Sequence, residues 1–170
     1  MKEEGFMTRR ILGGLAILLA SVAALPAQTA KPAAASNKQV QVADEIIALT
    51  RAHWAAEMKK DAAAWGKNVA DEYTVFEGAF PTRIDGKATM QHIVDGNFSG
   101  SDTLITAEMA NEKVQVYGDV AILSYNYIAS VKNKDGKVTP AMAKSTRVYV
   151  KQGGQWMLVH ANFAPVTAPN

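Results

Sequence analysis

The sequence has 170 residues and no cysteine. It therefore forms no disulfide, and it has no thiolate nucleophile, no sulfur ligand for zinc and no cysteine to carry a lipid. It also has little net charge, because 18 lysines and arginines stand against 16 aspartates and glutamates. This balance gives no electrostatic reason to expect binding to nucleic acid or to a membrane surface. The length predicts one soluble domain with a modest core.

Histidine is scarce as well, with three residues at His53, His92 and His160. None of them has the spacing of metal ligands, since the sequence contains neither a His-x-His nor a His-Glu-x-x-His motif. We therefore expect no metal site and no cofactor.

The one long apolar run lies near the N-terminus. Residues 1–27 combine a charged start that ends in Arg9 and Arg10, an apolar run from Ile11 to Leu25 and small residues after it. This order is typical of a secretory signal peptide, and the run is too short to span a bilayer comfortably. We therefore expect an exported protein, periplasmic or secreted, that has no membrane contact once residues 1–27 are removed. The pair Arg9-Arg10 matches a twin-arginine signal only in part, so the export route stays open.

The next residues, 28–41, are mainly small and polar and include Pro32, which predicts a flexible linker. The folded domain is expected over residues 42–166. Helical spacing of apolar residues begins at Ala43 and predicts two successive helices, of which the second is capped by Asp61.

The rest of the domain changes from helical to strand periodicity. A short strand over residues 73–78 and a third helix, capped by Asp85 and ended by Gly96, come first. After Ser101 the period is two residues, and three glycine-containing dipeptides predict hairpin turns, at residues 118–119, 135–136 and 153–154. Helices followed by an antiparallel meander predict an α+β fold, with the helices covering one face of a curved sheet.

The last predicted hairpin has an unusual polar content. If Gly153 and Gly154 form a two-residue turn, Arg147 lies directly opposite His160. One face of the hairpin then mixes aromatic and polar side chains, namely Ser145, Arg147, Tyr149, Trp156, Leu158, His160 and Asn162. Such a mixture lines ligand pockets, where a few polar groups orient an apolar guest. It also describes the rim of a dimer interface, so both interpretations stay open.

The residues of this hairpin carry a family resemblance. The ending T-R-V-Y-V…G-G-Q-W-M-L-V-H-A-N-F over residues 146–163 resembles the nuclear transport factor 2-like superfamily, in particular its SnoaL-like branch and the association domain of calcium/calmodulin-dependent kinases. Trp54, V-A-D-E-Y at residues 69–73 and D-G-K at residues 85–87 agree with it. The resemblance implies a cone-shaped α+β barrel, with N-terminal helices packed on a curved antiparallel sheet around a deep pocket. It also implies that Arg147 points into the pocket and that the protein is a homodimer.

The resemblance and the hairpin together suggest a function. We expect an exported SnoaL-like domain that binds a small, largely apolar organic molecule with an acidic or carbonyl end; the alternative is an enzyme of isomerase, dehydratase or hydrolase type. The residues expected to bind the ligand are Trp54, Tyr73, Phe76, Tyr125, Arg147, Tyr149, Trp156, His160 and Asn162. The catalytic candidates are His160, Arg147 and Glu77, the last because it is one of two carboxylates, with Asp71, expected to reach inward. Apolar residues expected at a dimer interface are Ile122, Ile128, Val148, Val159 and Phe163.

Overall fold

The computed structural model describes residues 36–166. The predicted signal peptide, residues 1–27, lies outside the described residues, and so does the linker up to residue 35. None of the helices in residues 36–166 is both long enough and apolar enough to cross a membrane.

The first helix, α1 (Asn37–Lys59), begins earlier than the sequence predicts. Its N-terminus is fixed by a capping box, in which the Gln39 amide donates to Ser36 Oγ at 3.3 Å and the Ser36 amide donates to Gln39 Oε1 at 2.9 Å. Residues 37–41 are therefore helical, and the linker prediction is wrong for them.

A short helix, α2 (Ala62–Gly66), follows, and Asp61 caps it as predicted: the Ala64 amide donates to Asp61 Oδ1 at 2.9 Å.

The third helix, α3 (Lys87–Ser99), differs from the prediction at both ends. Asp85 is not its N-cap, because it belongs to the two-residue strand β2 (Ile84–Asp85) and its carboxylate pairs with Arg83. The N-cap is Gly86, whose φ of 87° favours glycine. Gly96 does not end the helix, since a single glycine inside a helix costs only about 1 kcal/mol and is tolerated.

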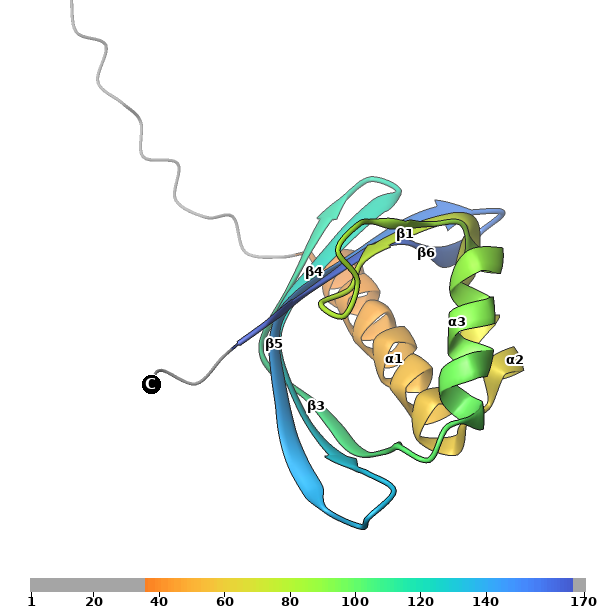
Figure 1. Ribbon diagram of the computed structural model, residues 1–170. Helices are drawn as coiled ribbons and strands as arrows, with labels where there is room; N and C mark the ends of the chain where they lie inside the picture. Colours follow the sequence, from red (N-terminus) through yellow and green to blue (C-terminus); the bar gives the residue numbers. More distant parts are fainter. Residues whose placement is uncertain (1–35, 167–170) are drawn as a thin grey trace, which may run out of the picture. The chain divides into compact units, whose positions relative to one another are not determined.

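The sheet has six strands in the order β2-β1-β6-β5-β4-β3. The remaining strands are β1 (Val69–Phe76), β3 (Thr103–Tyr117), β4 (Val120–Lys132), β5 (Val138–Gln152) and β6 (Gln155–Pro165). All pairs are antiparallel except β1–β6, which is parallel. The three predicted turns connect β3 to β6 in succession. The helices lie on one side of the curved sheet, which stays open between β2 and β3 (Figure 1). The predicted α+β fold is confirmed.

The core lies between the helices and the inner face of the sheet, which is the face turned toward α1. Side chains of α1 that point to the sheet, such as Ile46 and Trp54, are buried together with inner-face residues of β4, β5 and β6. The inner-face residues include Leu123, Tyr149 and Leu158. The alternation of strand side chains therefore separates an inner, buried face from an outer face that carries the partly exposed residues.

The predicted register of the last hairpin is wrong beyond its turn. Gln152 pairs with Gln155, as expected for a two-residue turn at Gly153-Gly154. The register then shifts between Tyr149, which pairs with Leu158, and Val148, which pairs with His160. Val159 is the extra residue of a β-bulge, and Arg147 therefore pairs with Ala161.

Candidate functional site

A buried arginine occupies the centre of the inner face. Arg147, on β5, is only 2% exposed. Its Nε donates to Tyr125 Oη at 3.1 Å. Its guanidinium carbon lies 5.8 Å from the ring centre of Trp54 and 5.6 Å from that of Phe163. The cation is thus surrounded by aromatic faces that attract it.

The charge of Arg147 is not neutralised by a direct ion pair. Within residues 36–166 no carboxylate oxygen lies within 4.0 Å of its guanidinium nitrogens. Its Nη1 is buried and has no hydrogen-bond partner, and the same holds for Ser145 Oγ on the same strand. A buried polar group without a partner costs about 1 to 3 kcal/mol, and a charged group costs more. The arrangement therefore has unused donors where an anion or a carbonyl oxygen would bind.

Tyrosines complete the cluster around Arg147. Tyr149 Oη lies 2.8 Å from Thr50 Oγ1, and the Thr50 hydroxyl donates to the Ile46 carbonyl. Because a hydroxyl has one proton, Tyr149 is the donor to Thr50. Burial disfavours the charged form of Arg147, but the oxygens of Tyr125 and the other tyrosines around it hold its pKa above the ordinary value.

Two groups of α1, the Glu57 carboxylate and the His53 imidazole, have pKa values that the charge of Arg147 affects. Glu57 Oε1 is 3.4 Å from His53 Nε2 and accepts a hydrogen bond from Trp65 Nε1 at 3.2 Å. The His53 ring packs on Trp65 with 4.8 Å between ring centres. The side chains of His53 and Glu57 are 10% and 28% exposed. The pair is therefore held in place and mostly shielded from water.

At neutral pH one of the two groups is charged and the other is not. Burial and the charge of Arg147 lower the pKa of His53, against the opposing effect of Glu57. Burial would raise the pKa of Glu57, but the hydrogen bond from His53 and the positive charge of Arg147 hold it below the ordinary value. Glu57 is therefore ionised and His53 neutral, which makes Glu57 the acceptor in their contact.

Glu77 is a second carboxylate whose pKa is affected by the charges of Glu57 and Arg147. It follows β1 and is only partly exposed. Burial and the negative charge of Glu57 raise its pKa, so that it holds its proton to higher pH than Glu57 does. Two carboxylates whose pKa values move in opposite directions are a common feature of acid–base sites.

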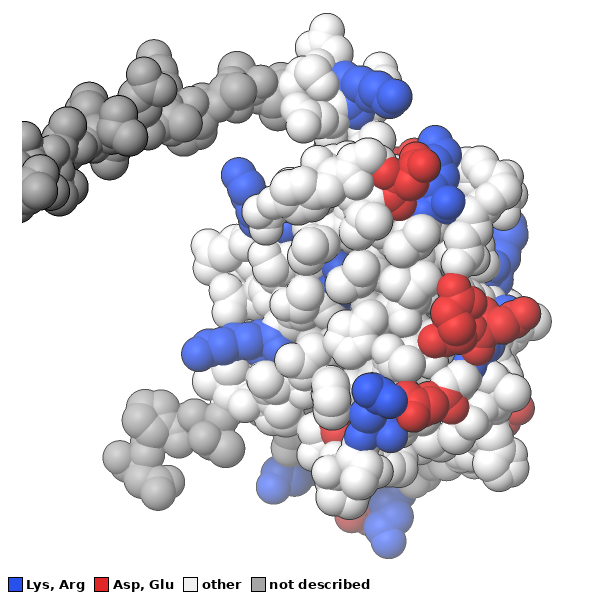
Figure 2. Space-filling model, turned by 90° about the horizontal axis from the view of Figure 1, so that it is seen from above, with Lys and Arg blue, Asp and Glu red and all other residues white. Residues whose placement is uncertain are grey.

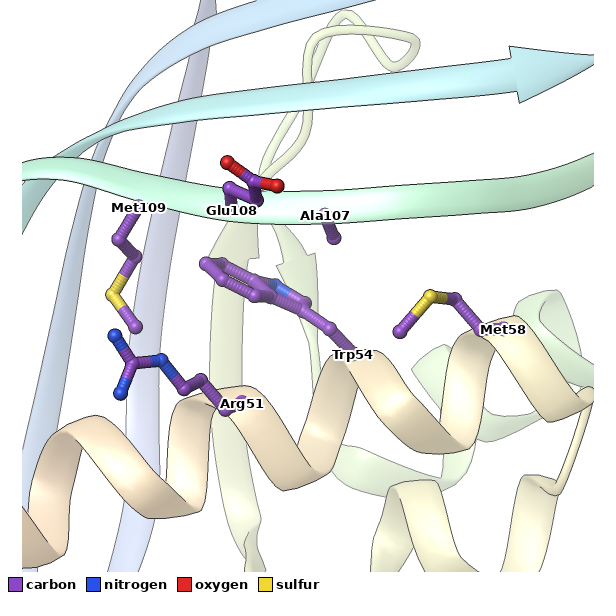
Figure 3. A pocket seen from close by; sticks show the side chains of 6 residues that line it. All are labelled: Arg51, Trp54, Met58, Ala107, Glu108 and Met109. Atoms are coloured by element: carbon purple, nitrogen blue, oxygen red, sulfur yellow. The ribbon is translucent and has the colours of Figure 1, made fainter.

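A groove reaches this interior from the side of α1 and β3. A cavity of about 340 Å³ is lined by Arg51, Trp54, Met58, Ala107, Glu108 and Met109. Figure 3 shows the Trp54 indole between the helix and the strand, with Met58 and Met109 on either side of it. Trp54 is 1% exposed and also lies against Arg147. It therefore forms a wall between the groove and the buried cation.

The surface shows no comparable concentration of charge in the view of Figure 2. Basic and acidic side chains there are interspersed over a largely uncharged face. The candidate site is therefore the interior cluster and the groove beside it.

The structure brings most of the predicted ligand-binding residues together. Those brought together are Trp54 on α1 and, on the inner face of the sheet, Tyr73, Tyr125, Arg147, Tyr149 and Trp156, and each of them is at least nine-tenths buried. Burial raises the pKa of Tyr73, which therefore stays protonated. Trp156 lies further from the cluster, beside the turn, where Lys151 stacks on its ring.

Three predicted residues lie on the other face of the sheet. Thr74 Oγ1 and His160 Nδ1 are 2.8 Å apart, and the His160 ring meets Phe76 edge-on at 6.1 Å. Phe76 is 48% exposed, and Asn162 is exposed as well. The bulge at Val159 turns His160 and Asn162 away from Arg147, while alternation along β1 turns Phe76 away from Tyr73. The predicted pairing of Arg147 with His160 is therefore wrong.

Sequence reasoning missed Glu57, Thr50 and the role of His53. The expectation that only Asp71 and Glu77 could reach inward is wrong, since Asp71 is exposed and Glu57 contacts buried groups. A signal was present: Thr50 and Glu57 are seven residues apart, and His53 and Glu57 four, so they line adjacent rows of one helix.

Comparison with known proteins identifies the family. Residues 42–166 match the calcium/calmodulin dependent protein kinase II association domain. The chain therefore belongs to this family, which agrees with the resemblance found in the sequence. No curated protein sequence matches it significantly.

Solved structures show the same fold. The association domain of C. elegans calcium/calmodulin-dependent kinase II has a TM-score of 0.65 at 22% identity, over 76% of this chain and 99% of that one. A proposed dehydratase of the nuclear transport factor 2-like family from Streptomyces avermitilis has 0.65 at 14%, over 76% and 99%. A proposed ketosteroid isomerase from Parabacteroides distasonis has 0.61 at 19%, over 78% and 94%. The chain thus has the nuclear transport factor 2-like α+β fold.

Proposed function

We propose that this domain binds a small, largely apolar organic molecule through an acidic or carbonyl end that contacts Arg147. The observation that carries the proposal is the buried Nη1 of Arg147, which has no partner among the described residues. A carboxylate could accept from Nη1 and balance the charge that Tyr125 and Ser145 leave unbalanced. The aromatic rings of Trp54 and Phe163 would contact the apolar part.

The groove offers a route to Arg147. Since Trp54 lines the groove and also lies against the guanidinium, a rotation of its indole would join the two. Met58 and Met109 beside it are flexible and can repack around an incoming apolar molecule. The ligand would then lie between α1 and the inner face of the sheet.

Export is part of this proposal. The charged start, the apolar run and the small residues of positions 1–27 support removal of a signal peptide and a periplasmic or secreted protein. The ligand would then be a molecule available outside the cytoplasm.

Native mass spectrometry of the exported protein tests these proposals directly. We expect a mass that lacks the first 27 or so residues, and an additional small acid that dissociates on activation. In a thermal-shift screen, small aromatic or alicyclic carboxylic acids should raise the melting temperature, because they bind only the folded state. Their methyl esters are the control and should give a smaller shift. Retention of Met1 contradicts export, and a screen in which no acid or ketone shifts the wild type contradicts the binding proposal.

Self-association through the outer face of the sheet is also proposed, as a homodimer. Ile128 and Met142 are cross-strand neighbours there and are 43% and 47% exposed, while Ile122 and Val148 form a second such pair. Phe163, expected at the same interface, instead packs inward against Tyr127. The family's association domains give further support.

The replacement Ile128→Lys should convert the dimer into a monomer, because it places a charge at the centre of an apolar interface. Sedimentation at micromolar concentration would measure the mass. Val40→Lys is the matched control, since Val40 is 49% exposed on the helical side, and it should stay dimeric. A wild-type protein that sediments as a monomer contradicts the proposal.

A further inference from the structure

A polar depression lies in the middle of the outer face of the sheet, the face turned away from α1. It has a volume of about 350 Å³. The polar side chains that line it on this face carry hydroxyl, amide and amine groups, namely Asn111, Ser124, Asn126, Lys144, Thr146 and Asn162. None of these lining side chains is a carboxylate. The depression therefore combines neutral hydrogen-bonding groups with one positive charge.

Strand pairing places these polar groups side by side. Ser124 pairs with Thr146, and Thr146 pairs with Asn162, so that one row crosses β4, β5 and β6. Asn126 pairs with Lys144 in the next row. Side chains directly opposite each other on one face of a sheet lie about 5 Å apart. One small ligand can therefore contact several of them at once.

The bulge in β3 fixes the direction of one amide of the depression. Asn111 has a φ of 55° at the point where the register between β3 and β4 shifts. Its Nδ2 donates to Asn126 Oδ1 at 3.0 Å. Because the oxygen of Asn126 is used in this way, the group that Asn126 offers to a ligand is Nδ2, which is a donor only. The Lys144 ammonium also has donors only, so the pair favours a ligand rich in acceptors.

The charge of Lys144 has no counter-charge beside it. Its neighbours across the strands are Asn126 and Ala164, and its neighbours on the same face of β5 are Met142 and Thr146. Within residues 36–166 no carboxylate oxygen lies within 4.0 Å of the Lys144 amine. In a single copy of the domain this is not costly, because Lys144 is exposed and water hydrates its amine.

The homodimer proposed above would change the surroundings of this amine. The apolar pair Ile122 and Val148 lies on one side of the depression, and the pair Ile128 and Met142 lies on the other. An interface that includes both pairs also covers the depression between them. A two-fold interface uses the same patch of both copies, so each copy brings one Lys144 amine to the covered space. Like charges that face each other there oppose association unless an anion lies between them.

We propose that a small, doubly charged oxyanion binds between two copies of this chain, held by the Lys144 amine and the Asn126 amide of each copy. This rests on the proposed homodimer and makes its stability depend on the anion. The two amines supply two positive charges, which a dianion of the phosphate or sulfate type balances through charge-assisted hydrogen bonds. The hydroxyls of Ser124 and Thr146 can donate to its remaining oxygens. Because the complete site exists only in the dimer, the anion strengthens the dimer by mass action.

Sedimentation with inorganic phosphate as the probe tests this proposal. Phosphate is titrated into phosphate-free buffer at constant ionic strength, at a slightly alkaline pH where it is a dianion. Once phosphate exceeds its own dissociation constant, the dimer dissociation constant of the wild type should fall by about tenfold for each tenfold rise in phosphate, because one anion is taken up per dimer. Sodium chloride at the same ionic strength is the control and should not have this effect.

Variants of Lys144 separate a specific site from a general salt effect. Lys144→Met should dimerise more tightly than the wild type without phosphate, because the facing charges are gone, and phosphate should no longer strengthen its dimer. Lys144→Gln lacks the charge but stays polar, and it decides the test if methionine on this face causes aggregation. Lys144→Arg should keep the phosphate dependence, since a guanidinium binds phosphate well. Lys134→Met, at an exposed position between β4 and β5, is the matched control and should behave as the wild type.

The outcomes distinguish this proposal from the homodimer proposal. A wild-type dimer with the same dissociation constant at every phosphate concentration contradicts the anion site and leaves the homodimer standing. A wild type that is monomeric at every phosphate concentration contradicts both. A Lys144→Met dimer that phosphate strengthens as much as the wild type shows that Lys144 does not hold the anion. Glu108 is an exposed carboxylate opposite Ile128. If Glu108→Gln abolishes a dimer that phosphate does not affect, Lys144 pairs with Glu108 of the partner subunit and the anion site is wrong.

Discussion

Replacement of Arg147 with methionine should weaken binding of an acidic ligand by about 10- to 150-fold, which corresponds to the loss of one charge-assisted hydrogen bond. The melting temperature should stay the same or rise. The reason is that Arg147 is buried without a neutralising carboxylate, so removal of its charge relieves a desolvation cost. Methionine fills most of the space of the arginine stem between Trp54 and Phe163. Calorimetry measures the affinity and a thermal scan the stability.

Two further variants show whether the effect depends on the guanidinium in its buried place. Arg83→Met removes an exposed arginine that does not line the groove and should change affinity little. Arg147→Lys keeps the charge but lacks the planar fork, so its affinity should be intermediate. If Arg147→Met unfolds the protein and no acid shifts the wild type, or if the folded variant binds acids as tightly as the wild type, the cluster is structural and the proposed binding site is wrong.

Local features of the fold could be predicted from the sequence because they depend on a few neighbouring residues. Asp61 caps α2, and the turn at Gly153-Gly154 has φ of 56° and 87°, as a two-residue hairpin turn requires. Helix ends were less predictable where two signals compete. Asp85 has the chemistry of an N-cap, but a salt bridge to Arg83 and pairing with Thr74 hold it in a strand.

The register of the last hairpin could not be predicted, because the bulge at Val159 depends on tertiary structure. β6 lies between β5 and β1, and its register is irregular against both neighbours in this region. The parallel pairing with β1 was itself unexpected. A single extra residue reverses the faces of everything beyond it, which is why Trp156 was placed correctly and His160 was not.

Glu57 was missed because its burial also depends on tertiary structure. Glu57 is on the helical stripe next to Trp54, where an isolated helix would expose it. It becomes shielded only because α2 folds back and Trp65 donates a hydrogen bond to it. Arg147, in contrast, was found because a cation among aromatic side chains on a strand face is unusual whatever the register.

Replacement of Trp54 with alanine should destabilise the domain by about 3 to 5 kcal/mol, the cost of removing a large buried aromatic side chain. Trp54 is 1% exposed and packs against Tyr125 and Tyr127 at 5.6 and 5.3 Å between ring centres. Denaturant unfolding measures the change. Tyr117→Ala is the control, since Tyr117 is 60% exposed, and it should cost about 0.5 kcal/mol or less.

The Trp54→Ala substitution also removes the side chain that separates the groove from Arg147. Loss of the indole removes one aromatic face from the guanidinium and joins the groove to the buried Nη1. Small acids should therefore raise the melting temperature of Trp54→Ala by at least as much as that of the wild type, although the variant starts lower. Trp54→Phe keeps a ring at the wall and should recover most of the stability. If Trp54→Ala is as stable as Tyr117→Ala, the indole is not part of the core, and the groove cannot reach Arg147 by its displacement.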